Sequence, residues 1–230
     1  MTLHLSGPFS YRGAMSPRPA ILLTGFGPFP GVPVNATSVF VPQLAAAARQ
    51  RFPAASVVAE ILPTEWHAAP RRLEALLAAH EPTLAVHFGV SAEAHGLVIE
   101  TTARNLTCAK ADACGALPGS PQVIALAAEI LETPLPANDM VARLMQRGVP
   151  SSLSTDAGRY LCNAVLYRSL HHAATRAPGL RAVFVHLPAS LLEPGAGIPP
   201  PNCPLDWAQG LAGGLEILSI ALESLLPTAA

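Results

Sequence analysis

The chain has 230 residues, half of them apolar and only 13% charged, and its 14 basic and 15 acidic residues leave a formal net charge of −1. This length and composition allow one large hydrophobic core, and the balanced charge favours neither a nucleic-acid nor a membrane partner. We expect residues 19–230 to form a single α/β domain. Residues 1–18 have no basic start and no apolar stretch of signal-peptide length, so we expect a disordered extension or a vector-derived remnant there.

Apolar runs of strand length alternate along the chain with longer segments of helical periodicity. The strand-like runs cover 20–26, 56–63, 83–90, 97–103 and 182–188, and the helical patterns cover 36–52, 64–81, 137–148, 160–176 and 205–225. Thr64 is the expected N-cap of the second helix and Gly148 ends the third. Such alternation predicts a largely parallel sheet with helices on both faces.

In a sheet of this kind the functional residues gather at the carboxyl ends of the strands. Three segments meet that condition: the loop 24–35, the segment after Val90, and the segment around His186. The segments 106–122 and 189–204 are rich in Pro, Gly and Cys, and we expect them to form excursions over the same edge.

The four cysteines (Cys108, Cys114, Cys162 and Cys203) are not spaced like a zinc site or a disulfide framework. We therefore expect no metal, no other cofactor and no disulfide, in a cytoplasmic protein in which one thiol could be catalytic.

Cys162 lies near the start of a predicted helix in "TDAGRYLCNAVLYRSLHH" (155–172). The first amides of a helix are unpaired and favour negative charge, so they favour the thiolate form of a cysteine at that position. The thiolate is the nucleophilic form, which makes Cys162 the candidate nucleophile. The same amides can hold an oxyanion. The alternative is that Cys162 is a small core residue facing the sheet.

A thiolate nucleophile needs a base, and His186 stands at the end of the apolar run "AVFVHLP". The alternative is a hydrogen-bonded structural histidine at a strand end. We interpret His87, in the middle of "AVHFGV", as structural, and we expect His171 and His172 on a helix surface.

A third residue should orient the imidazole. Glu100 is an isolated acid among apolar residues in "GLVIETTARN", which is costly without a partner. Asp156 is the rival, but its position before Ala-Gly favours a turn, and Asp206 is expected to be a helix N-cap.

The loop "TGFGPFPGVPVN" (24–35) has glycines between a strand and a helix, as phosphate-binding loops do. Its spacing is wrong for such a loop and no lysine follows, so nucleotide binding is disfavoured. We interpret Gly25, Gly27 and Gly31 as hinges that let the backbone approach a small ligand. The only lysine of the chain, Lys110, we attribute to a coding bias towards arginine.

Four blocks, at 24–38, 86–105, 154–172 and 182–188, together resemble the pyroglutamyl peptidase type I (pyrrolidone carboxyl peptidase) family of cysteine peptidases. The resemblance implies a catalytic triad of Glu100, Cys162 and His186. It also implies a substrate site that includes Phe26 and Phe29, to which we add Tyr160 and Leu161 beside the cysteine.

The same resemblance implies an α/β/α sandwich around an open, twisted, largely parallel (mixed) sheet. It implies peptide substrates, hydrolysis of an N-terminal pyroglutamyl residue through an acyl-enzyme, and a possible homo-oligomer. Because the pyroglutamyl lactam is uncharged, its recognition should need ring contacts and backbone hydrogen bonds and no cationic group. Two alternatives stay open: a cysteine amidohydrolase acting on another small cyclic or acyl amide, and a non-catalytic homologue.

Overall fold

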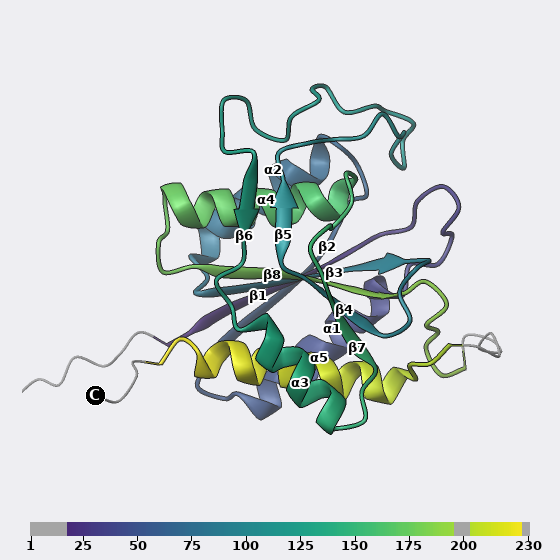
Figure 1. Ribbon diagram of the computed structural model, residues 1–230, viewed down its shortest axis with the longest axis vertical. Helices are drawn as coiled ribbons and strands as arrows, with labels where there is room; N and C mark the ends of the chain where they lie inside the picture. The colour runs from purple at the N-terminus through teal and green to yellow at the C-terminus, as the bar shows by residue number, and fades with distance from the viewer. Residues whose placement is uncertain (1–17, 196–202, 227–230) are drawn as a thin grey trace, which may run out of the picture.

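The computed structural model describes residues 18–195 and 203–226, which build three layers with a twisted sheet in the middle (Figure 1). The helices are α1 (Thr37–Arg51), α2 (Ala68–His80), α3 (Ala137–Gln146), α4 (Leu161–Thr175) and α5 (Trp207–Glu223). The strands are β1 (Ala20–Phe26), β2 (Ser56–Leu62), β3 (Leu84–Ser91), β4 (Leu97–Glu100), β5 (Thr102–Arg104), β6 (Ile130–Glu132), β7 (Ser151–Ser154) and β8 (Arg181–Pro188).

The described strands form a six-stranded sheet in the order β2-β1-β3-β8-β4-β7 and a separate two-stranded ribbon of β5 and β6. Strands β2, β1, β3 and β8 run parallel, β4 pairs antiparallel with β8, and β7 runs parallel to β4. This confirms the predicted α/β architecture with a mostly parallel mixed sheet. The central strands β1, β3 and β8 are buried along nearly their whole length, as strands covered on both faces must be.

Helices α1, α3 and α5 cover one face of the sheet, and α2 and α4 cover the other (Figure 1). Alternation along β8 divides its side chains between two cores: Val183 and Val185 pack towards α1 and α5, and Phe184 packs towards α2 and α4. His186 follows the same alternation, so it faces α4.

Two sequence expectations about the elements are wrong, and two strands were missed. The run 97–103 is two strands, β4 and β5, which belong to different sheets. Strands β6 and β7 were not predicted, because both are short and mostly polar or exposed. The second helix begins at Ala68, and Thr64 does not cap it: the Thr64 hydroxyl donates to the carbonyl oxygen of Gly27, at 2.8 Å.

The loop after β1 is held by a polar cluster at the start of α1. The Thr37 hydroxyl accepts a hydrogen bond from the Phe26 amide (2.9 Å) and lies 2.8 Å from Asn35 Oδ1, and Asn35 Nδ2 donates to the Gly27 carbonyl (3.1 Å). A Cβ atom on Gly25 would lie 2.8 Å from the Thr37 carbonyl oxygen. The hinge interpretation of Gly25 is therefore corrected: this glycine is needed for the close approach of α1.

Two predictions fall on segments that lie partly outside the described residues. The predicted extension at 1–18 includes only Arg18 among them, and the Arg18 guanidinium donates to the carbonyl oxygens of Pro53 and Ala54 at 2.8 and 3.1 Å. The predicted excursion at 189–204 includes 196–202, which the structure does not describe. The other excursion, 106–122, is confirmed as a loop between β5 and β6. Within the described ranges, no helix has the length and apolar character needed to cross a bilayer.

Candidate active site

A cavity of about 510 Å³ opens at the carboxyl ends of β1, β3 and β8, within the size range of small-molecule sites. It brings together every residue that the sequence nominated for the site: Glu100, Cys162, His186, Phe26, Phe29, Tyr160 and Leu161. These residues come from four strands or loops and one helix, so only the fold places them side by side.

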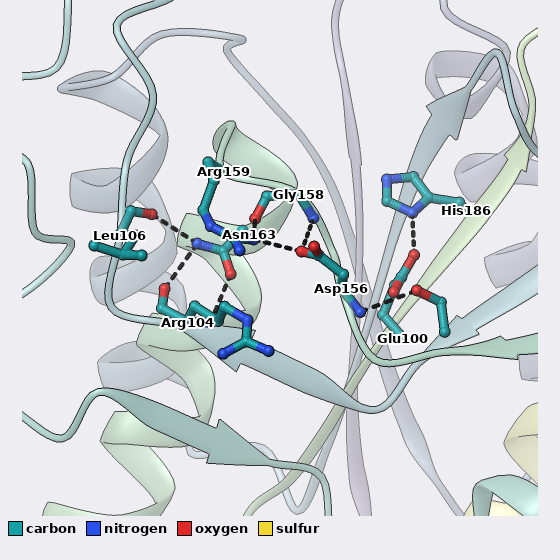
Figure 2. Close-up of polar contacts among 9 residues, drawn as sticks. Glu100, Arg104, Leu106, Asp156, Gly158, Arg159, Asn163 and His186 are labelled. Carbon is teal, nitrogen blue, oxygen red and sulfur yellow. Dashed lines mark hydrogen bonds and ion pairs between the residues drawn. The ribbon is translucent and has the colours of Figure 1, made fainter.

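His186 and Glu100 meet because neighbouring antiparallel strands place them diagonally on one face of the sheet. Val98 of β4 lies opposite His186, and Glu100 lies opposite Phe184, two residues before it. The imidazole Nδ1–H donates to Glu100 Oε1 at 2.7 Å, and its other nitrogen points away from the carboxylate (Figure 2). Both side chains are buried. Glu100 therefore fixes the tautomer and the orientation of the ring.

The pKa of His186 reflects these neighbours. Burial alone would lower it, but the Cys162 thiolate, through its charge and as a hydrogen-bond acceptor, together with Glu100, outweighs burial and raises the pKa to about 10. The structure thus favours an imidazolium at His186 at neutral pH, when a thiolate stands beside it.

Cys162 is the second residue of α4, and its thiol lies over the sheet face that carries His186. Gly89 of β3 is the register partner of His186, and a Cβ atom there would lie 3.1 Å from Cys162 Sγ and 2.7 Å from the Phe184 ring. The missing side chain at Gly89 is therefore what leaves space for the thiol.

The first turn of α4 is held in place by Asn163, which sequence reasoning missed. Its amide is buried and makes three hydrogen bonds of 2.8–2.9 Å: Oδ1 accepts from the Arg104 amide, and Nδ2 donates to the carbonyls of Arg104 and Leu106 (Figure 2). The signal available in the sequence was an asparagine directly after the candidate nucleophile and within a predicted helix, because helix interiors disfavour this residue.

Asp156 does not contact His186. Its Oδ1 accepts from the Gly158 amide at 3.1 Å and pairs with the Arg159 guanidinium, so it closes the turn that leads into α4 (Figure 2). Asp206 caps α5 as expected, with its Oδ1 accepting from the Gln209 amide at 2.7 Å. Of the three acids considered, only Glu100 reaches the imidazole.

His87 has the structural surroundings that its sequence position suggested. It is fully buried, Nδ1 lies 2.8 Å from the Thr24 hydroxyl, and Nε2 lies 2.8 Å from the Ser169 hydroxyl. Burial lowers its pKa to about 3, so the ring is neutral. His171 and His172 are half-buried near the end of α4, and His171 stacks on Tyr167.

The four substrate-site candidates form an aromatic and apolar wall of the cavity. Phe26 and Leu161 are buried, whereas Phe29 and Tyr160 are half-buried and their ring centroids lie 6.2 Å apart. Phe26 packs on Phe184, whose ring also contacts His186 at 4.8 Å between centroids. Phe184 therefore links Phe26 of this wall to the imidazole.

Lys110 also lines the cavity, although we had attributed this lysine to a coding bias. Its Nζ lies 5.1 Å from the ring centroid of Tyr160 and 5.9 Å from that of Phe29, both cation–π distances. The available signal was that this is the one lysine in a chain with thirteen arginines, and that it lies two positions from both Cys108 and Asp112 in a segment already expected to cross the site edge. The cavity is therefore not purely apolar.

Comparison with known proteins agrees with this geometry. A family model described as "Pyroglutamyl peptidase" matches residues 19–208. The pyrrolidone-carboxylate peptidase of Pyrococcus furiosus is 31% identical over 90% of this chain and 99% of its own length, and pyroglutamyl-peptidase 1 of Rattus norvegicus is 33% identical over 75% and 80%.

Solved structures lead to the same family. A mutant pyrrolidone carboxyl peptidase from P. furiosus superposes with a TM-score of 0.80 and 29% identity, covering 90% of this chain and all of the other. Pyroglutamyl peptidase I of Bacillus amyloliquefaciens superposes with a TM-score of 0.77 and 26% identity, covering 89% and 97%. The chain therefore belongs to the pyroglutamyl peptidase family and is a peptidase.

Proposed function

We propose that this protein removes an N-terminal pyroglutamyl residue from peptides, with Cys162 as nucleophile, His186 as acid and base, and Glu100 as the residue that orients the imidazole. The observation that carries this proposal is the 2.7 Å hydrogen bond from His186 to Glu100, in one cavity with a thiol at the head of α4 and the Phe26–Phe29 wall. A nucleophile, a base and an orienting group are the parts that covalent hydrolysis needs.

In the first step the Cys162 thiolate forms an S–C bond to the carbonyl carbon of the pyroglutamyl group. The imidazolium of His186 then gives its proton to the leaving amine as the C–N bond breaks. In the second step His186 takes a proton from water, the hydroxide attacks the thioester, and pyroglutamate leaves as the Cys162 sulfur departs. The raised pKa of His186 keeps a proton available for the first step.

The oxyanion formed in each step would lie against the start of α4. The helix ladder begins with the Ala164 amide bonded to the Tyr160 carbonyl at 3.1 Å, so the amides before it are outside that ladder. Unpaired amides and the helix dipole favour negative charge at this position. Because Asn163 holds this turn, the donors need little reorganisation during the reaction.

The Phe26–Phe29 wall would receive the five-membered lactam. A flat, uncharged ring gains from burial against aromatic side chains and brings no charge into them. An N-terminal glutamyl group would bring an ammonium and a carboxylate to the same place, at a desolvation cost that the lactam avoids.

A substrate panel tests the proposal and separates it from the two alternatives. Coumarin amides of pyroglutamate, proline and glutamate differ only in the acyl group, and release of the fluorophore gives kcat/KM for each. We expect hydrolysis of the pyroglutamyl amide alone. Preference for another acyl amide would support an amidohydrolase. If no substrate is cleaved by a folded protein with a free Cys162 thiol, the chain is a non-catalytic homologue.

A further inference from the structure

Lys110 stands at the part of the cavity lined by Phe29 and Tyr160. Its ammonium lies over the faces of two of the proposed lactam-binding rings, Phe29 and Tyr160. This placement puts one strong hydrogen-bond donor beside a wall that otherwise offers ring surface.

The backbone around Lys110 is anchored on both sides. The Lys110 carbonyl accepts from Trp66 Nε1 at 2.8 Å, and the next carbonyl, of Ala111, accepts from the Tyr160 hydroxyl at 3.2 Å. Asp112 is buried and accepts from the amides of Trp66, Cys114 and Ala116 at 2.8–3.0 Å. The loop therefore fixes the backbone position from which the Lys110 side chain reaches the Phe29 and Tyr160 rings.

The acids around the cavity do not neutralise Lys110. The carboxylates that line the cavity are Glu93, Glu100 and Asp156; Glu100 is bonded to His186 and Asp156 is paired with Arg159. Asp112 uses its oxygens on backbone amides. Among the described residues, no carboxylate lies within 4.0 Å of the Lys110 ammonium.

We propose that Lys110 is a specificity-determining residue that donates a hydrogen bond to the ring oxygen of the pyroglutamyl lactam. This oxygen is the group that distinguishes pyroglutamate from proline, whose ring carries a protonated amine instead. The same ammonium repels that amine, so one charge acts twice in favour of the lactam. The inference rests on the proposed function, and it departs from the expectation that lactam recognition needs no cationic group.

Inhibition by the two bare rings tests this role without depending on cleavage of a poor substrate. The probes are 2-pyrrolidone, which keeps the lactam oxygen, and pyrrolidine, which is protonated at neutral pH. Each inhibition constant is measured against the pyroglutamyl coumarin amide for the wild type, Lys110→Met and Lys110→Arg. Met keeps the length of the side chain without its charge, and Arg keeps the charge and the donors.

We expect Lys110→Met to weaken 2-pyrrolidone about tenfold, as for loss of one hydrogen bond to a charged group, and to raise KM for the substrate in proportion. Pyrrolidine should bind to Lys110→Met at least as tightly as to the wild type. Lys110→Arg should recover most of the affinity for 2-pyrrolidone. An unchanged ratio of the two inhibition constants in Lys110→Met would overturn the inference.

A second pair of substrates detects a different role for the lysine. If Lys110 binds the carboxylate of a short peptide, the Met variant will lose activity on pyroglutamyl-alanine but not on pyroglutamyl-alanine amide, and the inference is again overturned. If the wild type hydrolyses neither these peptides nor the coumarin amide, it is the proposed function that fails.

Discussion

Two buried histidines on neighbouring parallel strands have opposite surroundings. His87 of β3 and His186 of β8 both face α4, with the ring of Phe184 between them at 6.5 and 4.8 Å from the two imidazole centroids. Ser169 stands over His87, and Cys162, two turns earlier on the same face of α4, stands beside His186. The same helix thus presents a hydroxyl to one imidazole and a thiol to the other.

The difference shows that burial does not by itself make a histidine reactive. His87 has only hydroxyl partners, so burial lowers its pKa to about 3 and leaves a neutral ring that links β1, β3 and α4. His186 is nearly as buried, but Glu100 and Cys162 favour its charged form and raise its pKa. The ionisable partner, and not the depth, separates the structural site from the candidate catalytic one.

Among substitutions at the two histidines and their partners, the largest expected effect comes from removing His186. We expect His186→Ala to lower kcat for the pyroglutamyl coumarin amide by about 10⁴-fold, the upper end for a positioned acid–base group. The matched control is His87→Gln, whose amide can still hydrogen-bond to Thr24 and Ser169. Its folded fraction should keep wild-type kcat/KM. Comparable losses of activity per folded molecule in the two variants would erase the distinction between the histidines.

A smaller loss, about 10²-fold in kcat, is expected for Glu100→Gln, the lower end of the same range. This variant removes one of the groups that raise the pKa of His186, so the alkaline limb of kcat/KM should move to lower pH. The same interaction also contributes to folding stability. In the wild type, the contribution of charged His186 to the free energy of unfolding is complete below its unfolded pKa of 6.5 and is lost as pH rises towards about 10.

Urea unfolding gives a second measure of the same substitution. The difference in stability between wild type and Glu100→Gln should be largest below pH 6.5 and should shrink between there and pH 10. If the alkaline limbs of kcat/KM for the wild type and for Glu100→Gln coincide, Glu100 does not act on His186.

The smallest effect on turnover is expected for a substitution at Ser169, the hydrogen-bond partner of the structural histidine His87. Ser169→Ala removes the partner of His87 Nε2 and should lower the free energy of unfolding by about 1–3 kcal/mol, as for an unsatisfied buried polar group. The kcat/KM of the folded enzyme should not change, because Ser169 lies outside the cavity lining. Urea titration and initial rates on one preparation measure both quantities. A loss of turnover without a loss of stability would assign His87 to the reaction.

Much of the architecture was readable from the sequence because long apolar runs mark the buried strands. The predicted run 20–26 coincides with β1, and the expected helix ends agree with α1 and α4 within a residue or two. The edge strand β7, "SSLS", carries no such pattern, since its pairing with β4 is a backbone interaction that polar residues can also make. The division of 97–103 into β4 and β5 depends on the strands with which each half pairs, and this pairing is set by the tertiary structure.

The site was readable where chemistry alone marks a residue. A lone acid in an apolar strand, a histidine at a strand end and a cysteine at a helix start each suggested a role before their contacts were known. Lys110 was marked only as the one lysine of the chain, because its place over the Phe29 and Tyr160 rings depends on a loop that Trp66 and Asp112 hold. Gly89 carried no signal in the sequence: its role is the space that it leaves for Cys162.

The central claim is that the thiol of Cys162 performs the cleavage. The most direct measurement is kcat/KM for the pyroglutamyl coumarin amide in Cys162→Ala, beside Cys203→Ala, which removes a thiol outside the cavity lining. Circular dichroism and the unfolding midpoint establish that both variants are folded. Turnover should vanish in Cys162→Ala and stay at the wild-type value in Cys203→Ala. Pyroglutamyl hydrolysis that persists in Cys162→Ala would contradict the proposed mechanism.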